Sequence, residues 1–295
     1  MNAAVALMAY GSPERLADVP AYYADIRGGR PIAPEHLADL VERYRRLGVE
    51  EHNPLNAITE ETRAALEREL ALPVFTGMKH WTPRIADAAE SALETGADVV
   101  VGLVLAPHYS RLSIAGYRTQ LSDALADRAE LRMIESWHLF EPFIAWHASR
   151  LRGTPEHVVF TAHSLPARIV AEGDPYQEQL EETAAAIAQR AALGEGQWTF
   201  SYQSESPTGE PWLGPDILDH LSALHELGVS EVLICPIGFV SDHLEIRWDI
   251  DVEAQERAGE LGMTLRRIEM PNADPEFIDA LAELVQHEVG AHASR

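Results

Sequence analysis

The chain has 295 residues, of which 46% are apolar and 24% are charged, and its formal net charge is −24. This length suggests about two domains, since a domain usually contains roughly 100–200 residues, and the composition is that of a globular protein rather than a disordered one. The strong negative charge argues against binding to nucleic acid or to an anionic membrane surface, because both need clustered lysine and arginine.

Short apolar runs alternate with longer helical patterns along the chain. Several runs, such as VVVGLVLA and VLICPIGFV, are almost continuously hydrophobic, which is typical of strands buried on both faces of a parallel sheet. The predicted strands are residues 5–10, 74–78, 99–106, 131–137, 158–162, 198–203, 231–239 and 264–268. The predicted helices are residues 34–47, 59–70, 83–94, 175–192, 215–227, 243–260 and 275–289.

The recurring strand–helix–strand order predicts an α/β fold made of two Rossmann-like domains, each with a parallel sheet flanked by helices. Four predicted strands precede residue 138 and four follow it. We therefore expect a first domain of residues 1–138 plus 274–295, with the last helix packed back on it, and a second domain of residues 139–273. Ligands of such folds bind at the carboxyl ends of the strands, so a cleft between the two sheets is expected.

In the second half, His163 is the first candidate for chemistry, because it follows a buried strand in the stretch TAHSLP. Neutral imidazole can act as a general base or as a metal ligand. The alternative interpretation is a histidine held in a turn at the end of the strand, since structural pairs also perturb histidine.

Three carboxylates follow the strand at 231–239 and lie within the predicted helix 243–260. Glu245, Asp249 and Glu253 are spaced i, i+4, i+8, which places them along one drifting helix face, and a wider π-turn would align them better. Like charges repel at this spacing, so a cation is expected: Mg²⁺ suits oxygen ligands and Fe²⁺ suits a mixed histidine and carboxylate site. The alternative is a capping box in which Asp242 and Glu245 close the helix start.

Tyrosine and arginine are the notable polar residues of the first half. Tyr10 ends the first predicted strand, Arg27 lies in IRGGR, Arg43 and Tyr44 lie in ERYRR, and Tyr117 follows later. Arginine pairs with carboxylates bidentately, so a polycarboxylate ligand is expected; an exposed helix face with ion pairs is the alternative for ERYRR. Neither GxGxxG nor GxxxxGK[ST] is present, which argues against a nucleotide enzyme.

The single cysteine, Cys235, cannot form an intramolecular disulfide or a four-cysteine [2Fe–2S] cluster. The N-terminal segment lacks the positive start and the apolar run of a signal peptide. No stretch approaches the roughly 18 apolar residues of a spanning helix. We therefore expect a cytoplasmic protein with no integral membrane segment.

The chain resembles the ferrochelatases, most closely the coproporphyrin ferrochelatases of monoderm bacteria. The resemblance runs from MAYGSP through IRGGR, GMKHW, VLAPHYS, TAHSLP, QSESPTGEPWLGPD and GFVSDHLEIRWDID to MPNADPEFIDAL. It implies two Rossmann-like domains with a porphyrin cleft between them. It also implies a lyase that inserts Fe²⁺ into coproporphyrin III in haem biosynthesis, giving coproheme and two protons. The alternatives are a protoporphyrin IX ferrochelatase, another tetrapyrrole chelatase, and a haem-binding protein without turnover.

The resemblance also implies a role for each candidate residue. His163 and Glu245 match the catalytic pair that contacts the metal on one face of the porphyrin, and Tyr10 matches a tyrosine that contacts it from the other face. Asp249 and Glu253 match an outer metal position for Mg²⁺ or incoming iron. The positions that hold the porphyrin or its propionates are matched by Tyr10, Arg27, Arg43, Tyr44, Asn53 and Tyr117.

Two departures from the family pattern concern the propionate side. Asn53 stands where a serine is usual, after extra residues 50–52, and Gly28 stands where many relatives have arginine. The resemblance implies coproporphyrin III and Fe²⁺ as substrates, no tightly bound cofactor, and a downstream coproheme decarboxylase as partner. We expect the protein to act as a monomer.

Overall fold

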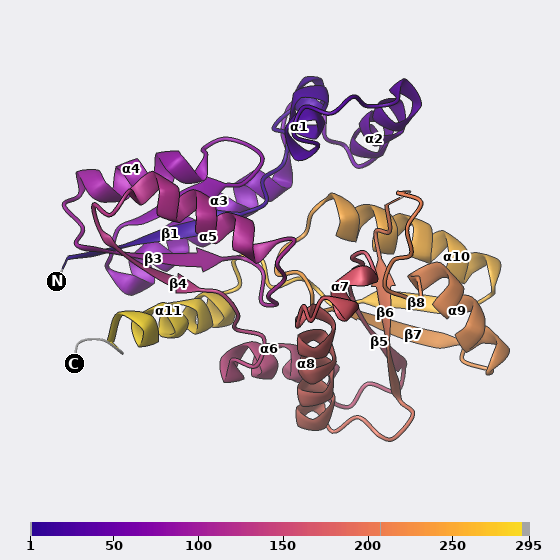
Figure 1. The fold of residues 1–295 in the computed structure, drawn as a ribbon. Helices are drawn as coiled ribbons and strands as arrows, with labels where there is room; N and C mark the ends of the chain where they lie inside the picture. Colours follow the sequence, from indigo (N-terminus) through magenta and orange to yellow (C-terminus); the bar gives the residue numbers. More distant parts are fainter. Residues whose placement is uncertain (1, 207, 291–295) are drawn as a thin grey trace.

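The computed structural model describes residues 2–206 and 208–290. In this part of the chain two four-stranded sheets are each flanked by helices (Figure 1). The strand orders are β2-β1-β3-β4 and β6-β5-β7-β8, and all pairings are parallel. The predicted α/β fold with two Rossmann-like halves is therefore confirmed.

The first sheet is buried on both faces, as its continuous apolar runs predict. Every residue of β1 and β3 is buried. One face packs on α4 and α5, and the other packs on α3 and α11. The elements of this half are β1 (Ala3–Ala9), η1 (Leu16–Asp18), α1 (Val19–Ile26), α2 (Pro34–Arg46), α3 (Pro54–Leu70), β2 (Val74–Met78), α4 (Ile85–Glu94), β3 (Val99–Val104), α5 (Ile114–Leu125) and β4 (Glu130–Ile134).

The second sheet is covered in the same way. Helices α6 and α8 pack on one face, and α9 and α10 pack on the other. The elements of this half are α6 (Glu141–Leu151), β5 (His157–His163), α7 (Arg168–Ala171), α8 (Tyr176–Ala191), β6 (Trp198–Gln203), α9 (Ile217–Glu226), β7 (Glu231–Pro236), η2 (Ile246–Ala254), α10 (Gln255–Glu260) and β8 (Thr264–Arg267). The last helix, α11 (Pro275–Gly290), returns to the first sheet.

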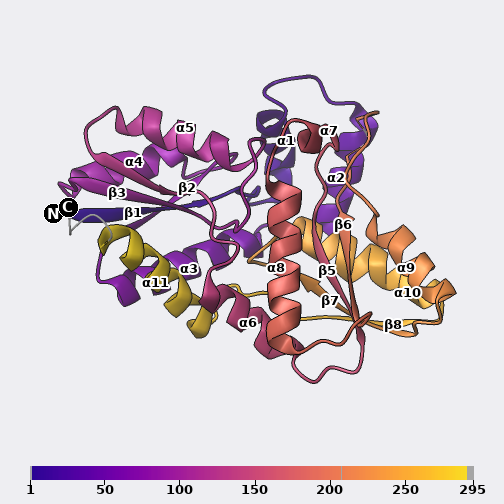
Figure 2. The ribbon, with the colours of Figure 1, turned by 60° about the horizontal axis from the view of Figure 1, so that its bottom comes forward.

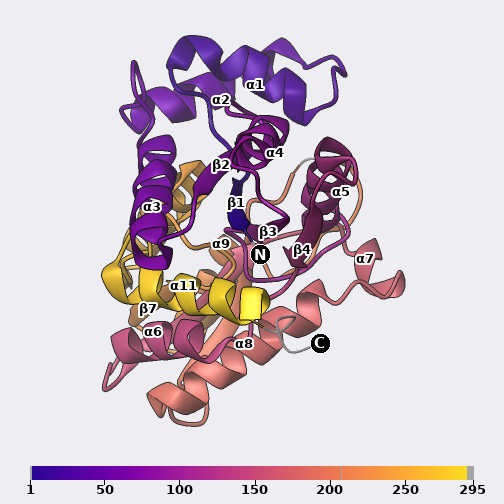
Figure 3. The same cartoon turned by 90° about the vertical axis from the view of Figure 1, so that its left-hand side faces the viewer.

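One apolar core is shared by both halves. It includes residues of β1, β3, β5 and β7 together with α6, α8 and α11. Helix α11, which follows the last strand, packs against α3 of the first half and also against α6 (Figures 2 and 3). The domain boundaries at 138/139 and 273/274 stay a prediction, and residues 291–295 of the predicted first domain lie outside the described residues.

Helices α1 and α2 stand apart from the first sheet, at the end toward which β1 points (Figure 1). A small apolar cluster joins Val19, Tyr44 and Val49 to Leu244, which lies just before η2. The helical pair of the first half is therefore tied to the helix that carries the three carboxylates.

The structure differs from the sequence prediction mainly in helices. The apolar patterns do not predict α1, α5, α6 or α7. Helix α6 buries residues around most of its circumference, including Phe143, Trp146 and Leu151, so its sequence has no clear polar face to indicate a surface helix. Glycines that follow the ends of α2, α4, α9 and α10 adopt positive φ, as the αL cap requires: Gly48, Gly96, Gly228 and Gly262. Among the described residues, no helix is long and apolar enough to span a membrane.

Candidate active site

His163 and Glu245 meet at the carboxyl edge of the second sheet. His163 Nε2 lies 3.4 Å from Glu245 Oε1. His163 is the last residue of β5 rather than a residue beyond it, and Glu245 lies in the helical turn just before η2. A loop separates Glu245 from β7, which ends at Pro236, earlier than the predicted strand 231–239.

The loop after β7 explains how Glu245 reaches His163. Strand β7 ends at Pro236, and the next two amides, of Ile237 and Gly238, both donate to the carbonyl of Thr161 in β5. A Cβ at Gly238 would lie 2.7 Å from the Cβ of Ala162, so only glycine allows this close approach. The loop thus packs against the end of β5 and places the following helix beside His163.

The imidazole of His163 is held on several sides. Its Nδ1 is hydrogen-bonded to the carbonyl of Ser164, and the hydroxyl of Tyr176 donates to the backbone oxygen of His163 over 3.0 Å. The rings of Trp212 and Phe239 lie 6.5 and 6.4 Å away, centroid to centroid. Nε2 is thereby left facing Glu245.

His163 and Glu245 shift each other's pKa values through their opposite charges. Burial disfavours the charged imidazole, but the carboxylate of Glu245 outweighs it and raises the pKa of His163 to about 9. Burial also opposes the charge on Glu245, whereas His163 and His243 hold the pKa of Glu245 well below its ordinary value. His243 Nε2 lies 3.3 Å from Glu245 Oε2. One carboxylate therefore lies between two imidazoles.

The capping-box interpretation of Asp242 and Glu245 is wrong. The carboxylate of Asp242 accepts hydrogen bonds from Arg267 at 3.0 Å and from Asn272 at 2.9 Å. Glu245, which occupies the N-cap position of η2, makes no side-chain cap hydrogen bond there. Neither carboxylate therefore caps the helix start. The carboxylate of Glu245 faces His163 and His243 instead.

Residues 246–254, within the predicted helix 243–260, form a π-helix, η2, the geometry that aligns the carboxylate row better than an ordinary helix. Asp249 is buried on it, its carboxylate accepts a hydrogen bond from the hydroxyl of Ser204, and Arg43 Nη1 is 4.0 Å away. Burial, together with the charges of Glu245 and Glu253, raises the pKa of Asp249 to about 7. The three carboxylates therefore act on one another along one helix, as their spacing predicts.

The oxygen donors at Asp249 and Glu253 suit the chemistry of Mg²⁺, which prefers carboxylate ligands. Glu253 is partly exposed, and its charge raises the pKa of Asp249 and of Asp216. Across residues 2–206 and 208–290, no three histidine, cysteine or acidic side chains already converge on a metal position. The Mg²⁺ site at Asp249 and Glu253 stays a prediction.

Tyr10 lies at the carboxyl edge of the first sheet, in the other half of the molecule. It directly follows β1, is 45% exposed, and its ring packs on His80 with a centroid distance of 4.6 Å. His80 Nδ1 is in turn 2.9 Å from a carboxylate oxygen of Asp25. Desolvation and the negative charge of Glu245 raise the pKa of Tyr10. The charge of Glu245 therefore acts on Tyr10 across the two halves.

The two predicted propionate-binding arginines have different environments. Arg43 donates to Asp39 at 3.0 Å, and its guanidinium lies 5.3 Å from the centroid of the Trp248 ring on η2. The Nε of Arg27 is buried and has no hydrogen-bond partner among the described residues. An unpartnered buried guanidinium nitrogen suits an anionic ligand, but contact of either arginine with a propionate stays a prediction.

Tyr44, Asn53 and Tyr117 are all buried. The Tyr44 hydroxyl is 3.3 Å from Ser12 Oγ, and Asn53 Nδ2 donates to the same Oγ at 2.6 Å. Asn53 also caps α3, so its amide holds the loop before that helix. Nζ of Lys79, the single lysine of the chain, lies 4.9 Å from the centroid of the Tyr117 ring. Porphyrin contacts of these three predicted residues remain untested, and the structure gives Asn53 a structural role.

The sequence patterns do not single out several residues that the structure places at the site. His243 and His80 contact predicted site residues directly. Gln203 is the last residue of β6 and Ser204 follows it, and the side chains of both reach the carboxylate helix. His163 is identified as a polar residue at the carboxyl end of a buried strand. The same criterion, applied to β6, identifies Gln203 and Ser204.

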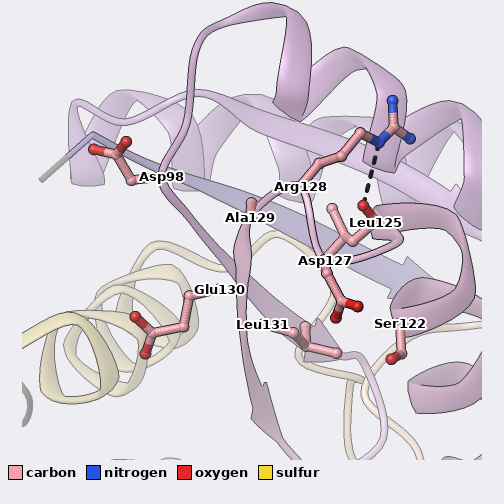
Figure 4. A pocket seen from close by; sticks show the side chains of 8 residues that line it. All are labelled: Asp98, Ser122, Leu125, Asp127, Arg128, Ala129, Glu130 and Leu131. Carbon is pink, nitrogen blue, oxygen red and sulfur yellow. Dashed lines mark hydrogen bonds between the residues drawn. The ribbon is translucent and has the colours of Figure 1, made fainter.

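A separate hollow of about 500 Å³ lies at the amino edge of the first sheet (Figure 4). Tyr10 lies at the opposite, carboxyl edge of that sheet. Ligands of parallel α/β sheets bind at the carboxyl edge, so this hollow is not the candidate active site. It is lined by Asp98, Ser122, Leu125, Asp127, Arg128, Ala129, Glu130 and Leu131.

Comparison with known proteins decides the family, because a ferrochelatase family model matches residues 2–289. This chain belongs to the ferrochelatase family. It is 43% identical over 301 residues to a ferrochelatase of Herpetosiphon aurantiacus, covering 96% of this chain and 97% of that protein. It is 40% identical over 298 residues to the coproporphyrin III ferrochelatase of Halalkalibacterium halodurans, covering 95% of each chain. As a ferrochelatase-family member, it is a metal-inserting enzyme of the lyase class.

Solved chelatase structures share the fold of this ferrochelatase-family chain. The structure of SirB from Bacillus subtilis with Fe³⁺ matches with a TM-score of 0.62 at 11% identity, covering 100% of this chain and 98% of that one. CbiX, described as the terminal enzyme of sirohaem biosynthesis in denitrifying bacteria, matches with a TM-score of 0.53 at 16% identity over 99% of both chains. At these identities the likeness concerns the fold alone.

Proposed function

We propose that this enzyme inserts Fe²⁺ into coproporphyrin III and releases two protons, giving coproheme. The observation that carries the proposal is the His163–Glu245 pair at 3.4 Å, with Tyr10 approaching it from the other half of the molecule. A flat macrocycle between Tyr10 and the pair would have a base and a metal ligand on one face and a phenol on the other. A coproheme decarboxylase would then act on the product.

The pair supports a proton-transfer role. With its pKa near 9, His163 holds a proton that it shares with Glu245 before Fe²⁺ arrives. The positive charge of an arriving Fe²⁺ favours loss of that proton, which can pass to Asp249, whose pKa is near 7. While Nε2 of His163 is not bound to the metal, it is a base for one pyrrole N–H proton, and the carboxylate of Glu245 is a base for the other.

The substrate proposal rests on the arginines of the first half. The buried Nε of Arg27 has no hydrogen-bond partner within residues 2–206 and 208–290, and Arg43 lies between Asp39 and Asp249. Four-propionate coproporphyrin III offers more carboxylates to these guanidinium groups than two-propionate protoporphyrin IX does. Relatives named simply as ferrochelatases and relatives named as coproporphyrin III ferrochelatases are similar to this chain to nearly the same degree, so the substrate needs a direct test.

The test is anaerobic iron insertion, followed by absorbance, with the two porphyrins side by side and in competition. We expect coproporphyrin III to have the higher kcat/KM by at least about tenfold, the factor that about 1.4 kcal/mol of extra transition-state binding gives. A higher kcat/KM for protoporphyrin IX would contradict the substrate assignment and leave the metal-insertion activity intact.

Replacement of the histidine tests the catalytic pair. His163→Ala should lower iron insertion by at least about 100-fold, since general acid–base groups contribute roughly 10²–10⁴-fold, while coproporphyrin III still binds. Turnover and porphyrin fluorescence quenching measure the two properties separately. His225→Ala, at an exposed position on α9, is the control and should keep full activity. Retained turnover in His163→Ala would remove His163 from the mechanism.

A further inference from the structure

Two consecutive residues at the end of β6 each bond to a carboxylate-bearing residue of the opposite helix. The side chain of Gln203 is fully buried, and its Nε2 donates to the backbone carbonyl of Glu245 over 3.1 Å. Its Oε1 accepts a hydrogen bond of 3.1 Å from the hydroxyl of Thr161 in β5. The hydroxyl of the next residue, Ser204, donates to the carboxylate of Asp249.

Gln203 is also the neighbour of His163 in the sheet. The two residues are register partners between β5 and β6, and the Gln203 carbonyl accepts a hydrogen bond of 2.7 Å from the amide of Ser164. Its backbone therefore fixes the strand end that carries His163, and its side chain holds the backbone of Glu245. A single residue connects both members of the catalytic pair.

The contact between Ser204 and Asp249 depends on an unusual backbone conformation of Ser204. Its φ is +66°, in the left-handed region that residues other than glycine rarely adopt. At this residue the chain leaves the extended path of β6, and the Ser204 hydroxyl reaches Asp249. Unfavourable backbone conformations of this kind persist where the surrounding structure imposes them, often at functional sites.

We propose that Gln203 and Ser204 are positioning residues that set Glu245 and Asp249 at their working distances from His163. Asp249 lies on the π-helix η2 and Glu245 is its N-cap residue. A π-helix is rarer and less regular than an α-helix, so contacts from outside the helix are needed to fix its first turns. Gln203 and Ser204 supply two such contacts, to Glu245 and to Asp249, which are four residues apart in the sequence. The inference rests on the proposed roles of His163, Glu245 and Asp249.

Gln203→Leu tests the link to Glu245. We expect kcat for iron insertion to fall about 10–100-fold, because misplacement of a reacting group by about 1 Å can cost 10² in rate. The Kd for coproporphyrin III should stay within about twofold of the native value, since Gln203 is buried and acts through Glu245. Thr161→Val removes only the donor to Gln203 Oε1 and should give a smaller loss in kcat, about threefold.

Ser204→Gly tests the link to Asp249 without a backbone penalty, because glycine adopts a positive φ readily. We expect the KM for Fe²⁺ to rise about tenfold, the effect of losing one hydrogen bond to a charged group, with unchanged porphyrin binding. Ser204→Asn should recover part of the loss, since asparagine tolerates this conformation and its amide can donate to Asp249. A merely structural role of Ser204 would predict no such recovery.

Thr199→Val is the matched control on the same strand, because Thr199 bonds to His157 and His220 away from the carboxylate helix. It should leave kcat and both KM values unchanged. Native kcat in folded Gln203→Leu together with native KM for Fe²⁺ in Ser204→Gly would overturn the inference, as would equal losses in porphyrin binding. If Gln203→Leu does not fold, Thr161→Val and Ser204→Gly decide. Turnover retained by His163→Ala would instead count against the proposed function.

Discussion

At the scale of single residues, two carboxylates on one helix have opposite pKa shifts. Glu245 lies between His163 and His243, which keep it ionised. Asp249, one turn further along, is buried between Glu245 and Glu253, and its pKa is raised to about 7. Groups whose environments separate their pKa values in this way are suited to different steps of proton transfer. The local neighbours, rather than the residue type, therefore determine what each carboxylate can do.

Tyr10→Phe tests the phenol on the other side of the site. The change keeps the ring that packs on His80 and removes only the hydroxyl, so folding and porphyrin affinity should be unchanged. If the hydroxyl contacts iron during insertion, kcat should fall several-fold, and the absorbance spectrum of bound coproheme should change because an oxygen ligand is lost. A changed spectrum with native kcat would limit Tyr10 to binding the product. An unchanged spectrum and rate would remove it from the site.

The sequence predicts the residues that stand at strand ends better than those that act through a hydrogen bond. His163 is found because polar residues at the carboxyl end of a buried parallel strand usually serve function. Asn53 is predicted to bind porphyrin, but its amide is occupied by Ser12, Pro13 and the start of α3. Its partners are distant in sequence or belong to the backbone, and residue spacing does not reveal them.

At the scale of secondary-structure elements, the ring of Trp248 on the carboxylate helix is one of the contacts that hold α2 in place. The guanidinium groups of Arg43 and Arg46 lie 5.3 and 4.8 Å from the centroid of the Trp248 ring. Arg46 also approaches Glu256 at 3.6 Å. Cation–π contacts of this kind contribute about 0.5–1 kcal/mol each when exposed, so the attachment is moderate and can be weakened without unfolding either half.

Arg46→Ala should loosen this attachment. Loss of about 0.5–1 kcal/mol corresponds to about a two- to fivefold faster exchange of the α2 backbone amides by local opening, which hydrogen–deuterium exchange measures. Arg45→Ala is the control, because the ion pair of Arg45 with Glu42 lies within α2 itself. Equal exchange rates in α2 for both variants would show that the Trp248 contact does not hold the helix.

Most elements follow from sequence periodicity, and the exceptions have physical reasons. The strands agree within a few residues because continuous apolar runs are unambiguous in a parallel sheet. Helix α6 is not predicted because it is buried on several sides, and α1 is not predicted because it has only eight residues. The π-helix is not predicted as such; the spacing of Glu245, Asp249 and Glu253 indicates only that a π-turn would align them better than an ordinary helix.

At the scale of the whole molecule, the two halves are joined by the shared core and by a polar contact beside it. The buried carboxylate of Asp174 accepts hydrogen bonds from Ser110 Oγ at 3.1 Å and from the amide of Arg111 at 2.8 Å. His108 Nε2 lies 2.9 Å from the hydroxyl of Thr183 in α8. The loop after β3 is thus bound to the segment that begins α8, so the relative placement of the halves depends on tertiary contacts that no local pattern predicts.

Acid should destabilise the fold through His147, which is fully buried in the shared core on α6. Burial and the charge of Arg150 lower the pKa of His147 to about 4 from 6.5, although its bond to the Phe143 carbonyl opposes this. The native state therefore binds fewer protons than the unfolded state between pH 6.5 and 4. This contribution is complete above pH 6.5 and is lost as the pH falls, by about 2 kcal/mol between pH 7.5 and 5.0.

Urea unfolding of the native protein and of His147→Asn at both pH values checks this expectation. The asparagine amide does not titrate, so the variant should lose about 2 kcal/mol less than the native protein between pH 7.5 and 5.0, whatever its stability at pH 7.5. The buried His108 is present in both proteins and cancels in the comparison. An identical loss in the two proteins would show that protonation of His147 does not limit stability in acid.

Lys79 is a site for selective covalent modification beside the candidate active site. Its amine donates to the carbonyl of Ser113 and lies against the ring of Tyr117, and burial lowers its pKa. A larger share of this amine is therefore uncharged and nucleophilic near neutral pH than is usual for lysine. Because the chain has no other lysine, an acylating reagent meets one side-chain target, which immediately precedes the His80 that supports Tyr10. Covalent labelling can thus place a single reporter group next to the site without engineering the sequence.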